Sequence, residues 1–428
     1  MEIEVLYGKG TLSATLPQGV GATVIEKPAM PLLPDPAGAL ANALDAPRTG
    51  NPLRELAATA SSACILICDI TRPVPNGILL RPIVQRLLAA GIERRKIVIL
   101  VATGLHRPNL GDELAEVIGD PWILENIEVA NHYARNDGDH VQVGITTKGT
   151  VVRLDRRLVE ADLRIATGLV EPHFMAGYSG GRKVIAPGVA HAETITTFHN
   201  HRFMSHPSAE NCVLEGNPLH EEQLEIVQML GGAHAVNTVI DDQRRLSFVN
   251  FGDIVESHLD AVRYVRQYAE VPCTRQFKTV VTSAAGYPLD KTYYQTVKGM
   301  VGALGILSDG GDLIIASECS EGIGSPEYRS SQARLVEKGG ERFLTEITGK
   351  AHAEIDEWQS QMQLKPLNRG QVTLVSGLGT SDRALTGVNN ATSLDAAIAD
   401  SLAKHGEDHV AVIPEGPYVI PVYQRSVF

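Results

Sequence analysis

The stretch CILICD (64–69), followed by ITRPVPNG (70–77), IVQRLLAAG (83–91) and KIVILVAT (96–103), decides the fold of this chain. The first and last segments are short apolar runs typical of buried strands, and the third has the apolar spacing of a helix. A turn rich in proline and glycine separates the first strand from that helix. The order strand, helix, strand predicts a βαβ unit and a largely parallel sheet.

The same alternation continues through most of the chain. ADLRIATG (161–168) predicts a third strand, and HAETITTFHNHRFM (191–204) predicts a helix. VPCTRQ (271–276) has the composition of a linker, and FKTVVTSA (277–284) begins a second series of strands and helices. We therefore expect an α/β protein with two domains, each a mostly parallel sheet flanked by helices.

The expected domains are residues 1–271, for cofactor binding and catalysis, and residues 272–428, on the substrate side. A chain of 428 residues with 43% hydrophobic residues can bury cores of that size. Whether the last 20 or so residues, including HVAVIPEGPYVIPV (409–422), return to the first domain is left open by the sequence.

Composition excludes several classes of partner. The formal charge is −12, from 38 basic and 50 acidic residues, which disfavours binding to nucleic acid or to an anionic membrane. MEIEVLYGKG lacks the apolar core of a secretory signal, and no apolar run approaches the ~18 residues of a membrane span. The five cysteines are scattered without metal-binding spacing. These features favour a cytoplasmic globular protein.

Three polar motifs punctuated by glycine or proline follow three of the predicted strands: DITRPVP (69–75), TGLHRP (103–108) and EPHFMAGYSGGRK (171–183). In open α/β sheets, ligands bind at the carboxyl ends of the strands. If the three strands are neighbours, the motifs share one rim and one site. Such a site would lie in the cleft between the two domains.

The glycine-rich motif has part of the spacing of a phosphate loop. Gly177 and Lys183 have the required separation, but Arg182 and Val184 flank the lysine, so the hydroxyl that binds Mg²⁺ is missing. ATP or GTP hydrolysis is therefore disfavoured. A backbone cradle for a phosphate or nucleotide is the preferred interpretation, and a glycine loop carrying a solvated lysine is the alternative.

Histidines and charged residues at the strand ends are the candidates for chemistry. His106 and His173 each follow a strand, and imidazole is suited to moving a proton near neutral pH. Asp69 could bind a ribose hydroxyl and Arg72 a carboxylate, or the two could simply pair with each other. In HNHRFMSH (199–206), the first two histidines would point to different faces of a helix, so at most one would face a metal.

In the second domain, YYQTVKGM places Tyr294 and Lys298 one helical turn apart, with Gln295 alongside. A solvated helix face would explain this spacing. The apolar surroundings of the lysine instead favour a side chain directed at a ligand.

Taken together and in this order, DITRPVP, TGLHRP, EPHFMAGYSGGRKVIAPG, TITTFHNHRF and YYQTVKGM resemble the catalytic protein of the nickel-pincer lactate racemase family. Each motif alone is weak, but the match covers nearly the whole chain. The resemblance implies a cofactor containing nickel, a pyridinium mononucleotide with a thioamide and a thiocarboxylate. It also implies racemisation or epimerisation of a 2-hydroxy acid by hydride transfer, through a 2-keto acid.

The resemblance also assigns roles to residues of this chain, with no departure at the matched positions. It implies covalent attachment of the cofactor at Lys183, nickel coordination by His199, and acid–base catalysis by His106 and His173. Cofactor contacts are implied for Asp69, Ile70, Thr71, Arg72, Gly180 and Gly181, and substrate contacts for Arg72, Tyr294, Gln295 and Lys298. The implied partners are a small 2-hydroxy acid and the proteins that synthesise the cofactor.

Two other functions compete with this interpretation. One is a nucleotide-dependent oxidoreductase or ligase that uses the 177–183 loop without a covalent bond, although the chain lacks GxGxxG after the first strand. The other is a nickel-binding protein without enzymatic activity, which would need a denser set of His or Cys ligands than HNHRFMSH provides.

Overall fold

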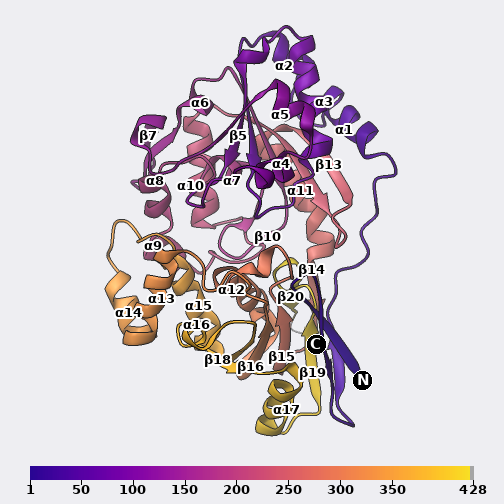
Figure 1. Ribbon diagram of the computed structural model, residues 1–428, viewed down its shortest axis with the longest axis vertical. Helices are drawn as coiled ribbons and strands as arrows, with labels where there is room; N and C mark the ends of the chain where they lie inside the picture. Colours follow the sequence, from indigo (N-terminus) through magenta and orange to yellow (C-terminus); the bar gives the residue numbers. More distant parts are fainter. Residues whose placement is uncertain (425–428) are drawn as a thin grey trace.

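The computed structural model describes residues 1–424, which form two α/β units stacked end to end (Figure 1). Each unit contains one six-stranded sheet with helices packed on its faces. The predicted α/β class with parallel sheets is confirmed. Within the described residues, no helix is long and apolar enough to cross a membrane.

The sheet of the first unit is parallel except for one edge strand. Its strands, in spatial order, are β13 (Leu246–Asp253), β12 (His234–Ile240), β9 (Leu163–Leu169), β4 (Ala63–Cys68), β5 (Ile97–Ala102) and β6 (Glu128–Asn131). The antiparallel strand is β13, which forms a hairpin with β12. Every residue of β4 is buried, as expected for a central strand covered by helices on both faces.

The helices of the first unit begin at recognisable caps. Asp253 accepts hydrogen bonds from the backbone amides of Val255 and Glu256, and Asn217 caps the helix that starts at Pro218. The longer helices are α1 (Pro36–Asp45), α3 (Asn76–Ala89), α10 (Pro218–Met229) and α11 (Ile254–Ala269). The shorter ones are α2 (Leu53–Ala58), α4 (Asp112–Ile118), α5 (Pro121–Asn126), α6 (Arg156–Val159), α7 (Arg182–Ile185), α8 (Ala192–Phe198) and α9 (His201–Met204).

The sheet of the second unit is parallel throughout. Its strands, in spatial order, are β18 (Asn389–Ala391), β17 (Gln371–Val375), β16 (Leu307–Ala316), β15 (Phe277–Ser283), β19 (His409–Ile413) and β3 (Gly21–Val24). Its helices are α12 (Tyr293–Gly302), α13 (Pro326–Lys338), α14 (Gly340–Ile347), α15 (Glu357–Arg369), α16 (Thr380–Arg383) and α17 (Leu394–His405).

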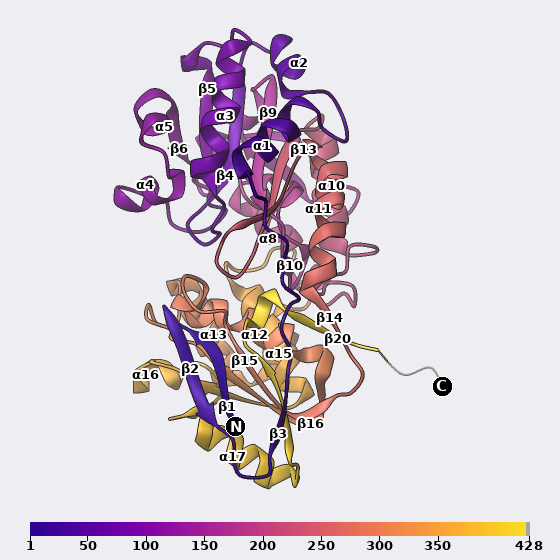
Figure 2. The ribbon, with the colours of Figure 1, turned by 90° about the vertical axis from the view of Figure 1, so that its right-hand side faces the viewer.

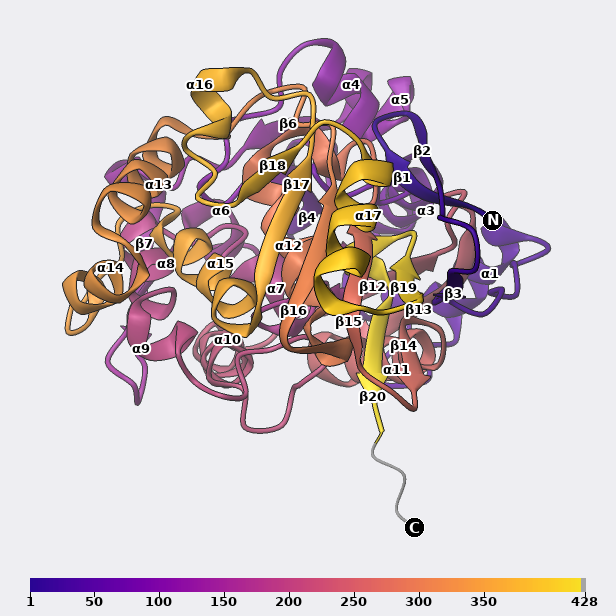
Figure 3. The same cartoon turned by 90° about the horizontal axis from the view of Figure 1, so that it is seen from below.

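Successive side chains of the second sheet point to opposite faces and pack into two separate hydrophobic cores. Val281 and Ile314 pack with apolar residues of α17, which crosses one face of the sheet (Figure 3). Val280 and Leu313, their neighbours in sequence, belong to the large core that includes residues of α12 and α15. The helix α12, which carries the predicted substrate residues, therefore lies on the face opposite α17.

The first 24 residues differ from the expected organisation, which placed them in the domain 1–271. β3 pairs in parallel with β19, and the hairpin β1 (Glu2–Tyr7)–β2 (Gly10–Thr15) packs against the second unit. Residues 25–35 then run along the molecule to α1 (Figure 2). The partner strand of β3 lies nearly 400 residues later in the chain, and the apolar partners of the hairpin lie beyond residue 280, so no local pattern reveals these contacts.

Two local expectations are also wrong. Residues 271–273 of the predicted linker belong to β14 (Glu270–Cys273), which forms a separate two-stranded sheet with β20 (Ile420–Tyr423). The single helix expected over residues 191–204 is two helices: the first ends at Phe198 with His199 as its C-cap, and Asn200 caps the next by accepting a hydrogen bond from the backbone amide of Phe203.

Two further hairpins are β7 (His140–Ile145)–β8 (Val151–Asp155) and β10 (Pro172–His173)–β11 (Gly177–Tyr178).

Candidate active site

The three strands that carry the polar motifs, β9, β4 and β5, are adjacent in the first sheet. Their carboxyl ends therefore lie side by side, and the motifs that follow them line one cavity of about 160 Å³. Side chains from α12 and from the start of α15 in the second unit complete its wall. The predicted residues along this inner cavity are Asp69, Thr71, Arg72, His106, His173, Gly180, Lys183, His199, Tyr294 and Lys298.

Asp69 and His106 form a hydrogen-bonded pair at the ends of β4 and β5. The Nδ1 atom of His106 lies 2.6 Å from Oδ2 of Asp69, while the other carboxylate oxygen accepts from the hydroxyl of Thr71 at 2.6 Å. Burial opposes both charges, yet the pair interaction outweighs it, so the pKa of His106 is raised and that of Asp69 is lowered. With Nδ1 donating to the carboxylate, Nε2 is the atom that can exchange a proton.

His173 lies in β10 in the opposite electrostatic setting. Its Nδ1 accepts hydrogen bonds from the backbone amides of Met175 and Ala176 at 3.3 and 3.2 Å. Burial, and then the positive charges of Lys183 and Arg72, hold the pKa of His173 well below its usual value. The imidazole is therefore neutral, and its Nε2 carries the proton.

The sequence suggested that Lys183 lies in a glycine-rich loop, but the structure places it in the short helix α7. Its backbone amide donates to the carbonyl of Gly180. Glycine is required at position 180 for two reasons: its φ is +75°, and a Cβ atom there would lie 2.8 Å from the side chain of Val170. Burial, and then the charge of Arg72, hold the pKa of Lys183 well below its usual value. An uncharged amine is the form that reacts as a nucleophile.

Arg182, beside the lysine, is fully buried and has no carboxylate partner within residues 1–424. Its guanidinium donates to the carbonyl of Ala176 at 2.9 Å and lies 3.0 Å from Nε2 of His258. Burial lowers the pKa of Arg182 to about 9. These contacts tie the start of the 176–182 segment to its end and to α11.

His199 ends α8, with one ring nitrogen occupied and the other free. Its Nδ1 donates to the carbonyl of Ile195 at 2.9 Å, which leaves the lone pair of Nε2 available for a metal. Burial, and then the charge of Lys183, lower the pKa of His199 to about 3. The rings of Phe198 and Trp358 lie 4.6 and 4.9 Å from the imidazole and restrict its orientation.

Two cations that could hold a carboxylate face the same cavity from different units. Arg72 forms an ion pair with Glu171, and the amine of Lys298 lies 5.9 Å from the ring centre of Phe174. Burial, and then the charge of Arg72, lower the pKa of Lys298 to about 7, against an opposing effect of Asp69. Repulsion between the two cations favours an anion between them.

The inner cavity opens into an outer chamber of about 770 Å³ lined by both units. Ile70 and Gln295 line this outer chamber and not the inner cavity, whereas Gly181 lines neither. Gly181 instead precedes α7 with a φ of +50°, close to His258. The structure thus brings most of the predicted site residues together and places these three at its margin.

Three residues of this region were not recognised from the sequence. Glu171 pairs with Arg72, Trp358 borders His199, and Asp356 lines both the inner cavity and the outer chamber. Asp356 is buried and has a left-handed φ of +65°, which is uncommon outside glycine and concentrates at functional sites. Only Glu171 lay within a quoted motif, and no spacing in the sequence marked the other two.

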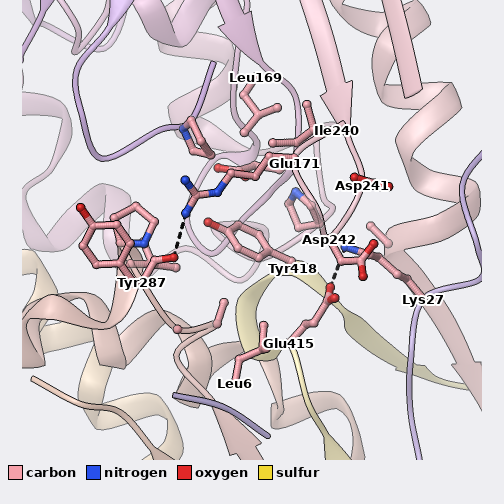
Figure 4. A pocket seen from close by; sticks show the side chains of 18 of the residues that line it. Leu6, Lys27, Leu169, Glu171, Ile240, Asp241, Asp242, Tyr287, Glu415 and Tyr418 are labelled. Carbon is pink, nitrogen blue, oxygen red and sulfur yellow. Dashed lines mark hydrogen bonds and ion pairs between the residues drawn. The ribbon is translucent and has the colours of Figure 1, made fainter. Parts of the chain in front are cut away.

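Glu171 also borders a second cavity, of about 470 Å³, between the units (Figure 4). There, Lys27 pairs with Glu415 at 2.6 Å, and Arg244 donates to the backbone carbonyl of Tyr287 at 2.9 Å. None of the residues predicted for the site lines this cavity. The residues predicted for the site therefore line the inner cavity and not this second cavity.

Comparison with known proteins identifies the family of the chain. Residues 7–211 match the family model of the lactate racemase N-terminal domain, and residues 274–421 match that of the lactate racemase C-terminal domain. The chain is 31% identical over 429 residues to the lactate racemase of Thermoanaerobacterium thermosaccharolyticum, covering 98% of both proteins. It is 32% identical over 382 residues to the lactate racemase of Lactiplantibacillus plantarum, covering 88% of this chain and 89% of that protein.

The fold is similar to solved structures as well. The lactate racemase apoprotein from T. thermosaccharolyticum superposes with a TM-score of 0.89 at 29% identity, covering 98% of this chain and 100% of that one. A crystal structure of a protein from Thermotoga maritima, at 16% identity and a TM-score of 0.66, shares the fold over 87% of this chain and 98% of its own length. The chain therefore belongs to the lactate racemase family and is an isomerase of the racemase class.

Proposed function

We propose that the protein inverts C2 of a 2-hydroxy acid by hydride transfer, using a nickel-pincer nucleotide attached to Lys183 with nickel bound at His199. The observation that carries this proposal is the meeting, in one cavity, of a buried lysine whose pKa is held well below its usual value, a histidine with a free Nε2, and two further histidines. Lactate is the substrate named for the relatives. Lactate is therefore the first substrate to test with this chain.

The residues present fit such a group. The lowered pKa of Lys183 favours the uncharged amine, which is the form that can make an amide-type link, and Gly180 leaves room beside it. Within residues 1–424, no cluster of three or more His, Cys, Asp or Glu side chains could hold a metal ion. A nickel ion at His199 would therefore need its other donor atoms from a bound organic group, as a pincer provides.

The chemistry that this group would supply when bound is the acceptance and return of hydride at C2 of the substrate. The C2 proton of a 2-hydroxy acid is not acidic beside a carboxylate, so direct proton removal is difficult. Hydride removal, in contrast, needs only that the hydroxyl loses its proton at the same time. The protein's contribution is therefore to bind the carboxylate and to move the hydroxyl proton.

His106 and His173 are proposed to move that proton. With Nδ1 donating to Asp69, the neutral ring of His106 can accept the hydroxyl proton at Nε2 and act as the base, while His173 presents Nε2–H and can act as the acid. The hydroxyl points in different directions in the two enantiomers, which gives each histidine a role. Arg72 and Lys298 would hold the substrate carboxylate and keep C2 in place.

Division of the site between two units would also protect the intermediate. Asp69, His106 and Lys183 belong to the first unit, and Lys298 and Asp356 to the second. Closure of the units around the substrate would exclude water and retain the planar 2-keto acid until hydride returns to either face. The site would thus be an interdomain cleft, and the group would be supplied by cofactor-synthesising proteins.

Isotope labelling tests the proposal. The protein is produced together with cofactor-synthesising proteins and incubated with one enantiomer of lactate deuterated at C2. We expect slowed racemisation and deuterium retained at C2 of the inverted product, measured by mass spectrometry after chiral separation. The Lys183→Ala protein is the matched control and is expected to be inactive. Complete exchange of the label with water would contradict hydride transfer.

A further inference from the structure

The outer chamber is far larger than a lactate molecule requires. It continues outward from the inner cavity and shares part of its wall, including Asp69, His106, Tyr294 and Asp356. Lactate has only a methyl group beyond C2. A substrate held by its carboxylate at Arg72 and Lys298 would have room for several further carbons in a chamber of about 770 Å³.

Two acceptor groups at the inner end of this chamber have unused capacity. Oε1 of Gln295 is buried and has no hydrogen-bond partner within residues 1–424. The carboxylate of Asp356 accepts from the hydroxyl of Ser325 at 2.5 Å, whereas an ionised carboxylate can accept about four hydrogen bonds. A buried acceptor without a donor is unfavourable, so these side chains favour a ligand that brings donors.

The distribution of charge determines which end of a substrate enters. Arg72 and Lys298 bring positive charge to the inner cavity, and Asp69 and Asp356 lie on the wall that it shares with the outer chamber. The outer chamber has three cations, Arg107, Arg135 and Lys291, and each pairs with a carboxylate there. Against them stand seven carboxylates, those of Asp69, Asp112, Glu113, Glu116, Glu321, Glu327 and Asp356. A carboxylate is therefore attracted inward, and a second anionic group on the substrate would be repelled.

We infer that the substrate of this protein is a polyhydroxy 2-hydroxy acid, a sugar acid of four or more carbons, whose hydroxyl groups beyond C2 donate hydrogen bonds to Gln295 and Asp356. This inference rests on the proposed function. The carboxylate and C2 occupy the inner cavity, and the polyol chain extends into the outer chamber. Because the other stereocentres keep their configuration, the reaction is then an epimerisation.

Substrate comparison tests the inference with the cofactor-loaded enzyme. The probes are lactate, gluconate, 2-hydroxyhexanoate and malate, each assayed for inversion at C2. We expect kcat/KM for gluconate to exceed that for each of the other three by at least tenfold. Equal or faster turnover of 2-hydroxyhexanoate would show that the substrate has an apolar tail and would overturn the inference. Preference for malate or for lactate would equally overturn the inference.

A variant tests the proposed contact directly. Asp356→Asn keeps the size of the side chain, and we expect it to lower the ratio of kcat/KM for gluconate to that for lactate by at least fivefold. Glu116→Gln, at an exposed carboxylate on the rim of the same chamber, is the matched control and should leave the ratio unchanged. Thermal unfolding checks that both variants are folded. An unchanged ratio in folded Asp356→Asn would refute the role of Asp356.

The outcomes separate this inference from the function on which it rests. Turnover of lactate without turnover of gluconate overturns the substrate class alone. If none of the four acids is turned over by enzyme whose intact mass shows the adduct and whose nickel content is stoichiometric, the proposed function itself is wrong.

Discussion

Lys298 gives a sharp test of how the site binds its substrate, because its charge depends on pH near neutrality. Burial and the nearby Arg72 lower the pKa of this amine to about 7, so about half of the molecules carry the charge at pH 7. The charged fraction falls to roughly one tenth at pH 8 and roughly one hundredth at pH 9, a loss of about 1 kcal/mol over the first pH unit and about 1.3 kcal/mol over the second. If Lys298 binds the substrate carboxylate, KM should rise about fivefold between pH 7 and pH 8 and about ninefold between pH 8 and pH 9.

The informative variant is Lys298→Arg. Guanidinium remains charged throughout this range, so the alkaline rise in KM should disappear even if turnover is slower because of the different shape. Initial rates from each enantiomer would be measured from pH 6 to pH 9 by chiral chromatography. Lys291→Arg is the control, because Lys291 pairs with Glu321 at 2.5 Å in the outer chamber and should leave the wild-type profile unchanged.

Two results would refute this reasoning. A constant KM for the wild-type enzyme between pH 7 and pH 9 would show that the amine is not deprotonated in this range or does not bind the carboxylate. An unchanged alkaline rise in Lys298→Arg would assign that rise to another group. Loss of activity at acid pH is a separate effect: His106 must be unprotonated to act as a base, and Asp69 raises its pKa.

Three further variants test the other roles. Asp69→Asn removes the negative charge that pairs with His106 and replaces one acceptor oxygen with a donor, so kcat/KM should fall by about 10²–10⁴ in initial-rate assays from both enantiomers; a loss below threefold would contradict the role of the pair. Lys183→Ala should abolish the covalent adduct, and an adduct of unchanged intact mass would disprove the attachment point. His199→Ala should lower nickel content, measured by elemental analysis, while the adduct remains; full nickel occupancy would place the ligand elsewhere, with His201 the next candidate.

Much of the fold could be predicted because its central strands have local patterns. The strands ACILIC (63–68) and IVILVA (97–102) are apolar over their whole length, since both faces of β4 and β5 are covered. β3 has no such pattern, because its four residues are only partly buried and its partner, β19, is distant in the chain. The break between α8 and α9 depends on one asparagine that acts as a cap, which apolar periodicity does not detect.

The part of the site that follows the strands of the first sheet could also be predicted from local patterns. His106 and His173 were found because each follows a strand, and the ends of neighbouring parallel strands converge. Asp356 and Trp358 follow no strand; they begin a helix of the other unit, and only the packing of the two units brings them to the cavity. The roles of Lys183 and His199 came from family resemblance, and the structure adds the burial and hydrogen bonds that suit them.

The pairing of β3 with β19 has a consequence for synthesis and for dissection of the chain. β3 is synthesised nearly 400 residues before its partner β19, so the unit between them can fold before the two strands pair. A fragment restricted to residues 274–421, the matched C-terminal domain, would lack β3 and leave the edge of β19 open. Open strand edges promote association between chains. The C-terminal domain should therefore remain monomeric only when residues 1–24 are supplied with it.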